Sequence, residues 1–240
     1  MSQESNVLLV GNGHLGGFIT KLLGKIHYTK RTRGDNESLL FDLDHTVKFT
    51  YPDSIETIIW TIPPHPNTEN ALEVLKNKNL IFISSTGVFT NGKVTNQSVP
   101  DSDSKNGVLL SRAEKFIEDN FKRFVIIRPG GLVDNLRHPK NFFKTSKNIK
   151  NSNHPINLVH TEDVARFVIH LCKQSFYKEK YNLVANPNQI TKKQFYSSFD
   201  LKNEFTYQDT EVPAKEIDME WLRDAKFQLK YPDIYKHFTN

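Results

Sequence analysis

The chain has 240 residues, of which 37% are hydrophobic and 25% charged, and its formal net charge is +5. This length fits one large domain, or one domain with a smaller lobe, and the charged fraction argues against global disorder. A single cysteine, Cys172, excludes a disulfide within the chain, and we expect a buried thiol. The polar start MSQESN, with no apolar run of about 18 residues after it, predicts a cytoplasmic protein that does not enter a membrane.

The excess positive charge comes mostly from lysines that are scattered among asparagines. A compact Lys/Arg run of the kind that follows a phosphate backbone is not found in the sequence. We therefore interpret the lysines as a solvated surface and expect no nucleic-acid partner. Only the sequence pI of about 9.1 supports a surface that binds nucleic acid. Nucleic-acid binding is therefore the weakest of the three functional hypotheses that the sequence allows, and the other two are given below.

Strands that are apolar throughout alternate with helices in the first half of the chain. This pattern is typical of a parallel sheet covered on both faces, with right-handed crossovers. The sequence therefore predicts an α/β fold built on a doubly wound, Rossmann-type parallel sheet. The expected strands are 7–10, 26–29, 38–41, 57–62, 80–84 and 124–129, and the expected helices are 14–23, 67–76 and 109–121.

The sequence becomes more polar after the last of these strands, and residues 134–155 are predicted to form an irregular excursion over the carboxyl edge of the sheet. A helix is predicted over 161–173, with Thr161 as N-cap and with Glu162 and Asp163 in the first turn, where the helix dipole favours negative charge. The predicted division is a sheet domain of residues 1–133 with additions from 156–186, and a small C-terminal lobe of residues 134–155 and 187–240.

Three glycines lie in the turn between the first strand and the first helix, in the spacing Gly11-x-Gly13-x-x-Gly16. In a dinucleotide-binding turn the first glycine permits the tight bend, the second lets the backbone approach the pyrophosphate, and the third lets the helix pack closely. The amides at the start of the helix would then face the phosphates. The alternative is a turn shaped by packing alone, which the neighbouring α/β pattern makes the weaker interpretation.

The end of the second strand indicates which dinucleotide is preferred. The segment HYTKRTRGD places Lys30, Arg31 and Arg33 where an NAD site usually has a carboxylate, and Asp35 lies late for that role. Arginine can hold a 2′-phosphate with paired hydrogen bonds, whereas a carboxylate would repel it. We therefore expect NADP rather than NAD, the alternative being that these basic side chains are merely exposed.

Several segments in order resemble the extended short-chain dehydrogenase/reductase superfamily, in its sugar-nucleotide epimerase/dehydratase branch, over nearly the full chain. The segments are VGNGHLGG, FDLDH, FISSTGVF, IIRPGGLV, INLVHTEDVARFVIHL, YNLVANPNQITKKQFY and KFQLKYPDIYKHF. The resemblance implies a domain that binds NAD(P) and a C-terminal lobe that closes over a small-molecule substrate. It also implies a homodimer through the helix at 109–121, although the mixed apolar and charged side chains of that helix leave the oligomeric state open.

The resemblance places Thr86 at the position of the catalytic hydroxyl, with Ser84 and Ser85 lining the same strand end. We take Thr86 and Ser85 as the candidate catalytic residues. The glycine turn and the resemblance together predict a larger set of cofactor-binding residues. These are Gly11, Asn12, Gly13, His14, Leu15, Gly16, Lys30, Arg31, Arg33, Asp42, Leu43, Thr61, Ile62, Pro63, Ser84, Arg112, Pro129 and Gly130.

The sequence departs from the family at its Tyr-x-x-x-Lys pair, in which tyrosine exchanges a proton with the reacting oxygen. If Ser111-Arg112 matches the family's Ser-Lys, the tyrosine position is Val108. If the following Ala-Glu is matched instead, the pair becomes Asn106 and Leu110, and neither alignment supplies a tyrosine. Arg112 could contact ribose or phosphate, but its pKa is too high for proton exchange.

Another residue could replace the missing tyrosine. His138, in the excursion after the sixth strand, titrates near neutrality and is one candidate, while His160 begins a helix and could simply bond the backbone. No metal-ligand spacing and no Ser-His-Asp signature are present in the sequence. Two hypotheses therefore lead: an NADP-dependent oxidoreductase or epimerase-like enzyme for a sugar-like or nucleotide-linked carbonyl compound, and a non-catalytic NADP-binding sensor or partner-binding protein.

Overall fold

The computed structural model describes residues 6–32, 38–45, 50–143, 147–175, 178–200 and 204–239. Its central layer is a seven-stranded sheet with the order β11-β7-β5-β4-β1-β2-β3, and every neighbouring pair is parallel. This order confirms the doubly wound, Rossmann-type α/β fold. The strands are β1 (Val7–Val10), β2 (His27–Lys30), β3 (Ser38–Leu40), β4 (Thr57–Trp60), β5 (Asn79–Ile83), β7 (Phe124–Pro129) and β11 (Lys178–Leu183).

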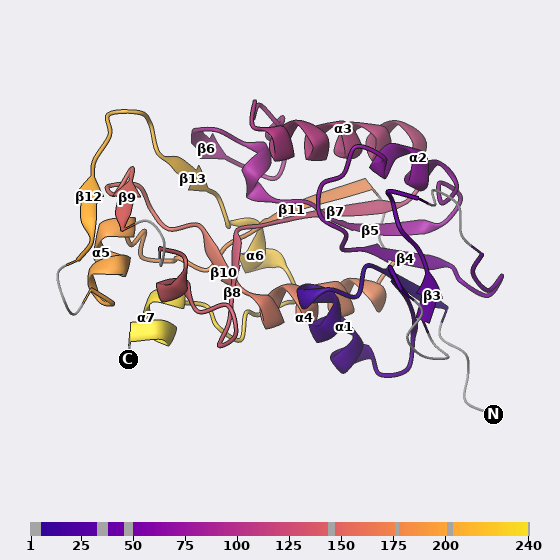
Figure 1. The fold of residues 1–240 in the computed structure, drawn as a ribbon. Helices are drawn as coiled ribbons and strands as arrows, with labels where there is room; N and C mark the ends of the chain where they lie inside the picture. Colours follow the sequence, from indigo (N-terminus) through magenta and orange to yellow (C-terminus); the bar gives the residue numbers. More distant parts are fainter. Residues whose placement is uncertain are drawn as a thin grey trace.

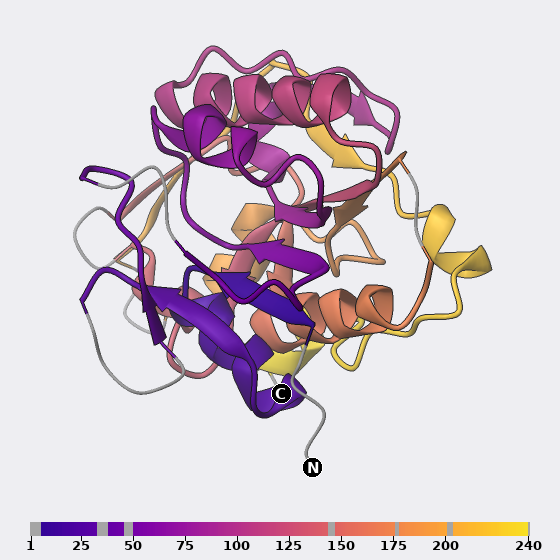
Figure 2. The same ribbon diagram turned by 90° about the vertical axis from the view of Figure 1, so that its right-hand side faces the viewer.

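Helices cover both faces of this sheet (Figure 1 and Figure 2). On one face lie α2 (Thr68–Glu73) and α3 (Lys105–Asn120), and on the other lie α1 (His14–Leu23) and α4 (Thr161–Cys172). No helix in the described part of the chain combines the length and the apolar character that a membrane span needs.

Alternation along each buried strand divides its side chains between two cores. In β1, Leu8 and Val10 pack with the side chains of α2 and α3, whereas Val7 and Leu9 pack with those of α1 and α4. A strand that is buried on both faces is mostly apolar along its length, which explains why β1 and β4 show no polar alternation in the sequence. The sheet is therefore the rigid centre of the molecule. The ends of its buried strands fix the positions of the loops that follow them.

A smaller lobe lies beyond the carboxyl edge of the sheet and is held by its own core around Ile149, Phe195, Tyr196 and Ile234. Three short parallel pairs build it and join it to the sheet domain: β8–β10, β9–β12 and β6–β13. The remaining elements are η1 (Thr86–Val88), β6 (Gly92–Val94), β8 (Gly131–Val133), η2 (Pro139–Asn141), β9 (Asn148–Lys150), β10 (Leu158–His160), α5 (Lys192–Ser197), β12 (Thr206–Gln208), β13 (Lys215–Ile217), α6 (Trp221–Asp224) and α7 (Ile234–Thr239).

Two helix starts differ from the sequence-based expectation because other side chains cap them. Helix α3 begins at Lys105, earlier than predicted, since the Ser104 hydroxyl accepts a hydrogen bond of 3.1 Å from the Gly107 amide. Helix α4 is capped by His160, whose Nδ1 accepts from the Glu162 amide at 3.2 Å, so the prediction of Thr161 as N-cap is wrong. His160 thus bonds the backbone, as one of its two interpretations proposed.

A buried ion pair joins α3 to β7. Arg128 and Glu114 have side-chain exposures of 0% and 1%, and the guanidinium donates to the carboxylate through Nη2 at 2.6 Å and through Nε at 3.1 Å. The Ser84 hydroxyl donates to the same carboxylate at 2.5 Å. Phe89 lies under the guanidinium, with its ring centroid 4.9 Å from Cζ. One carboxylate therefore holds a helix, a central strand and the end of β5 together.

Removing that carboxylate would leave a guanidinium buried without its partner. We expect Glu114→Ala to lower the free energy of unfolding by about 3–5 kcal/mol, measured by urea denaturation. Lys115→Ala is the matched control in the same helix, since the Lys115–Asp119 pair is exposed and solvent already screens it. Equal stability losses in the two variants would contradict a structural role for the buried pair.

Candidate functional site

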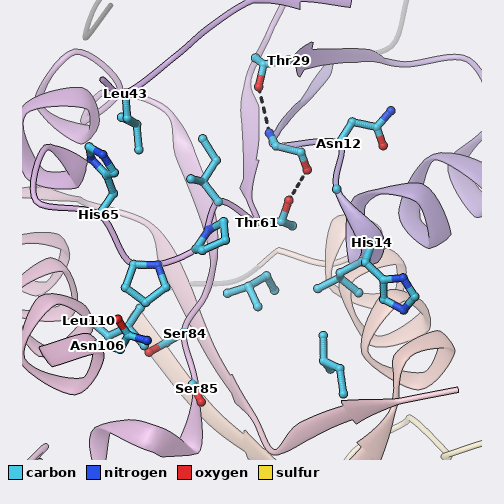
Figure 3. A pocket seen from close by; sticks show the side chains of 18 of the residues that line it. Asn12, His14, Thr29, Leu43, Thr61, His65, Ser84, Ser85, Asn106 and Leu110 are labelled. Carbon is cyan, nitrogen blue, oxygen red and sulfur yellow. Dashed lines mark hydrogen bonds between the residues drawn. The ribbon is translucent and has the colours of Figure 1, made fainter. Parts of the chain in front are cut away.

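A cleft of about 840 Å³ opens at the carboxyl edge of the sheet (Figure 3). It lies over the ends of β1 and β4, the two neighbouring strands from which the chain winds outward in opposite directions. Ligands of open α/β sheets bind at this topological switch point. The residues after β1, β2, β4 and β5 form the floor of the cleft, and the first turns of α1 and α3 form its sides.

The turn after β1 is tied to the strands on both sides. The Gly11 amide donates to the Thr29 hydroxyl of β2 at 2.9 Å, and the Thr61 hydroxyl after β4 donates to the Gly11 carbonyl oxygen (Figure 3). Gly11 has φ of +100°, and a Cβ there would lie 2.8 Å from Ile62. Gly16 packs against the same turn, because a Cβ there would lie 2.5 Å from the Gly11 carbonyl oxygen. Both positions therefore require glycine.

The start of α1 faces the cleft without a capping side chain. Gly13 occupies the N-cap, and a Cβ placed on it would meet no heavy atom within 4 Å, so the space beside the helix start is open. The N-terminal amides of a helix carry partial positive charge and need acceptors. Nearby, Asn12 Oδ1 is buried and has no hydrogen-bond partner among the described residues. The uncapped amides of α1 thus offer donors to an anionic ligand such as a pyrophosphate, whereas Asn12 Oδ1 is an acceptor and would need a donor from the ligand.

Most of the predicted cofactor-binding residues meet at this cleft. Gly16 is not among those that line it, because it lies beneath the turn, and Arg33 falls outside the described residues. Ser84 lines the cleft, but its hydroxyl is held by Glu114. The predicted residues that line the cleft are Gly11, Asn12, Gly13, His14, Leu15, Lys30, Arg31, Asp42, Leu43, Thr61, Ile62, Pro63, Ser84 and Ser85.

Three predicted cofactor contacts lie elsewhere. Arg112 is 56% exposed and forms a 2.8 Å ion pair with Glu69, so it does not reach the cleft. Pro129 ends β7 and is buried, and Gly130 packs against the lobe, where a Cβ would lie 2.4 Å from the Asn157 carbonyl oxygen. Gly130 is therefore explained by close packing of the backbone.

The structure distinguishes the two alignments of the missing Tyr-x-x-x-Lys pair. Asn106 and Leu110, one turn apart on α3, both line the cleft near Ser84 and Ser85 (Figure 3). Val108 is 42% exposed and does not line it. The positions that face the cleft are thus an amide and an aliphatic side chain, and neither can exchange a proton near neutral pH.

Of the two histidines that line the cleft, His14 was predicted and His65 was missed in the sequence, and each is fixed by a partner far along the chain. His14 Nε2 lies 2.6 Å from the Asp134 carboxylate, which also accepts from Thr161. These hydrogen bonds outweigh the effect of burial and lower the pKa of Asp134. His65 Nε2 lies 2.9 Å from Asp44, whose pKa the bond to that histidine lowers. In the sequence, the only signal for a missed lining residue was a polar side chain in the segment that follows a strand.

A second cavity of about 740 Å³ adjoins the cleft, between the sheet domain and the lobe. Ser85 and Gly87 line both spaces, whereas Thr86 lines the second one alone. Of the two candidate catalytic residues, Ser85 therefore lies where the cavities meet, and Thr86 lines the second cavity only. The second cavity is also lined by Lys150, Lys192 and Lys215.

Neither candidate histidine lines either cavity. His138 packs edge-on against Phe238, with ring centroids 4.8 Å apart, and its Nδ1 accepts from the Lys140 amide at 3.2 Å. His160 stacks on Tyr231 with ring centroids 3.8 Å apart. Burial lowers the pKa of both imidazoles. The geometry thus gives both histidines structural roles and leaves the missing tyrosine without a histidine substitute.

The sequence matches no known protein-family profile and no curated protein. Solved structures, however, match nearly the whole chain. A UDP-N-acetylglucosamine 4-epimerase from Bacillus cereus is 14% identical and covers 97% of both chains, with a TM-score of 0.73. The human epimerase family protein SDR39U1, solved with NADPH, is 12% identical over 97% of both chains, with a TM-score of 0.72.

A dTDP-glucose 4,6-dehydratase from Bacillus anthracis, solved with NAD, is 13% identical and covers 97% of this chain and 94% of its own, with a TM-score of 0.71. The chain has the fold of the NAD(P)-dependent epimerases and dehydratases. This finding confirms, at the level of the fold, the resemblance that the sequence segments indicated. One of these similar proteins was solved with NADPH and another with NAD.

Two adjacent glycines of α1 offer a matched test of the turn. We expect Gly16→Ala to destabilise the protein, because its Cβ would press on the Gly11 backbone. Gly17→Ala should raise stability by about 0.5–1 kcal/mol, since a Cβ there meets no atom within 4 Å and alanine favours a helix. Thermal unfolding measures both. Equal behaviour of the two variants would refute the close approach.

Proposed function

We propose that the protein binds NADP(H) in the cleft and acts as an oxidoreductase or epimerase-like enzyme on a small sugar-like or nucleotide-linked carbonyl compound. The observation that carries the proposal is the uncapped start of α1 behind the pinned Gly11 turn. By contrast, Ser104 caps α3 and His160 caps α4. A helix whose amides face a cleft without a cap is suited to phosphate oxygens.

The basic end of β2 supports NADP over NAD. Lys30 and Arg31 line the cleft beside Thr29, which bonds the glycine turn. The nearest lining carboxylate along the chain, Asp42, follows β3 rather than β2. A guanidinium at the end of β2 would attract a 2′-phosphate, and no carboxylate lies at that strand end among the described residues.

Ser85 is the residue that we assign to the reacting oxygen. Its Oγ accepts a 3.0 Å hydrogen bond from the Gly87 amide, so its own hydrogen can be donated to a carbonyl oxygen. It lies at the junction of the two cavities, where a substrate in one space would meet a dinucleotide in the other. Bound NADP(H) would supply hydride chemistry there, and Ser85 would polarise the substrate carbonyl.

A second candidate function is a non-catalytic NADP-binding sensor. The observation that favours it is the pair Asn106 and Leu110 at the cleft positions where the family pattern requires tyrosine and lysine. Without a group that exchanges protons, reduction of a carbonyl needs its proton from solvent. A sensor would use the same cleft to bind the dinucleotide and would change shape or partner without turnover.

The choice of dinucleotide can be tested directly. We expect the protein to bind NADPH more tightly than NADH. Arg31→Ala should weaken NADPH binding by about tenfold and leave NADH unchanged, because only NADPH carries the 2′-phosphate. Arg123→Ala is the control, because Arg123 directly precedes β7 at the amino end of the strand and does not line the cleft. Tighter binding of NADH by the wild-type protein would overturn the assignment of NADP.

Turnover distinguishes the enzyme from the sensor. We expect a panel of sugar-like and nucleotide-linked carbonyl compounds to include one that oxidises NADPH in the presence of the protein. Ser85→Ala should then lower kcat/KM by about 10²-fold, as expected for loss of a donor to the developing oxyanion. Thr86→Ala is the matched comparison, since Thr86 faces only the second cavity. NADPH binding without turnover of any compound would favour the sensor.

A further inference from the structure

The second cavity has an unusual charge balance. Three lysines reach it from three different elements: Lys150 ends β9, Lys192 begins α5, and Lys215 begins β13. Not one aspartate or glutamate is found among the described residues that line it. The other polar lining groups include the amides of Asn148 and Asn157. A cavity with this lining is suited to a negatively charged ligand.

Two of the lysines are fixed by main-chain carbonyls. Lys215 Nζ donates to the Thr86 and Phe89 carbonyl oxygens at 2.8 and 2.9 Å, which brings an ammonium group to the turn that follows Ser85. Lys192 Nζ reaches the Lys150 carbonyl oxygen at the long distance of 3.4 Å. These carbonyls accept hydrogen bonds but carry no full charge, so the positive charges are positioned without being neutralised.

Their surroundings oppose the charged state of these lysines. Burial lowers the pKa of Lys192, and burial together with the charge of Lys192 lowers the pKa of Lys215. Asp101, which does not line the cavity, partly offsets this effect on Lys215 through its charge, and its carboxylate accepts from the Thr90 amide at 2.8 Å and the Thr90 hydroxyl at 2.7 Å. An anion between the lysines would remove the repulsion that the cavity otherwise carries.

We propose that this lysine-lined cavity binds a phosphoryl group of the substrate, beside the reacting position at Ser85. Ammonium groups that approach from three elements match a dianion with several outward oxygens better than a planar carboxylate, which presents two. The identification of the bound group as part of a substrate rests on the proposed function. Anion binding itself does not, since the three lysines lie outside the dinucleotide cleft.

Lys215 could instead serve only to clamp β13 to the turn at Thr86, so Lys192 gives the cleaner test. Calorimetric titration of inorganic phosphate and pyrophosphate, in the absence of dinucleotide, should show binding by the wild-type protein and weaker binding of acetate. We expect Lys192→Met to weaken phosphate binding by about tenfold and Lys192→Arg by about threefold or less, because arginine keeps the charge. Added salt should weaken wild-type binding.

Lys193→Met is the matched control, because Lys193 is the next residue of α5, is exposed and does not line the cavity. Unfolding midpoints establish that each variant is folded. Phosphate bound at the glycine turn would be insensitive to Lys192, so equal phosphate affinities of Lys192→Met and Lys193→Met would overturn the proposal. Failure of the wild-type protein to bind either anion at millimolar concentration would do the same.

The same variants separate this inference from the proposed function. NADPH affinity should be unchanged in Lys192→Met, since that side chain does not line the cleft. If phosphate binding depends on Lys192 while neither dinucleotide binds, the lysine-lined cavity stands and the cofactor assignment falls. If NADPH binds while phosphate binding ignores Lys192, the cofactor assignment stands and the phosphoryl site falls.

Discussion

The constraint on which the cleft depends is the crowding around the Gly11 turn. Strands β2 and β4 each place a threonine hydroxyl against it: Thr29 accepts from the Gly11 amide, and Thr61 donates to the Gly11 carbonyl oxygen. These two hydrogen bonds hold the carboxyl ends of β1, β2 and β4 next to one another. Because Gly16 packs on the same carbonyl oxygen, the start of α1 is drawn against the turn, and its amides face outward over the sheet edge. A side chain at either glycine would change the space that a dinucleotide needs.

The far wall of the cleft depends on a different kind of contact. Glu114 bonds Arg128 of β7 and the Ser84 hydroxyl at the end of β5, so α3 is fixed in position above both strands. Buried ion pairs of this kind are poor sources of net stability, but they permit few alternative arrangements. Here the arrangement presents Asn106 and Leu110 to the cleft and leaves Ser85 at its end. Rigid walls on both sides suit a ligand that must be held in one orientation.

The architecture could be predicted from the sequence because its strongest signals are local. Apolar strands such as Val7–Val10 and Phe124–Pro129 are buried on both faces, and their composition alone indicates a covered parallel sheet. Residues at the carboxyl ends of β1, β4 and β5 line the cleft for the same reason, whereas Pro129 at the end of β7 does not. The misplaced and the missed residues depend on distant partners. The pairing of Arg112 with Glu69 and the pairing of His65 with Asp44 join segments that no periodicity relates.

The two cavities meet at a single short turn, and this arrangement limits the chemistry that the site can support. Ser85 can donate a hydrogen bond to a carbonyl oxygen, but a hydroxyl with an ordinary pKa does not deliver a proton at neutral pH. Asn106 and Leu110 cannot deliver it either. Lys215 holds the carbonyls of Thr86 and Phe89 from the other side, so the lobe and the reacting position share one anchor. A ligand that moved the lobe lysines would therefore move the Ser85 turn with them. In such a site the positioning of substrate against cofactor, more than proton transfer, would set the rate.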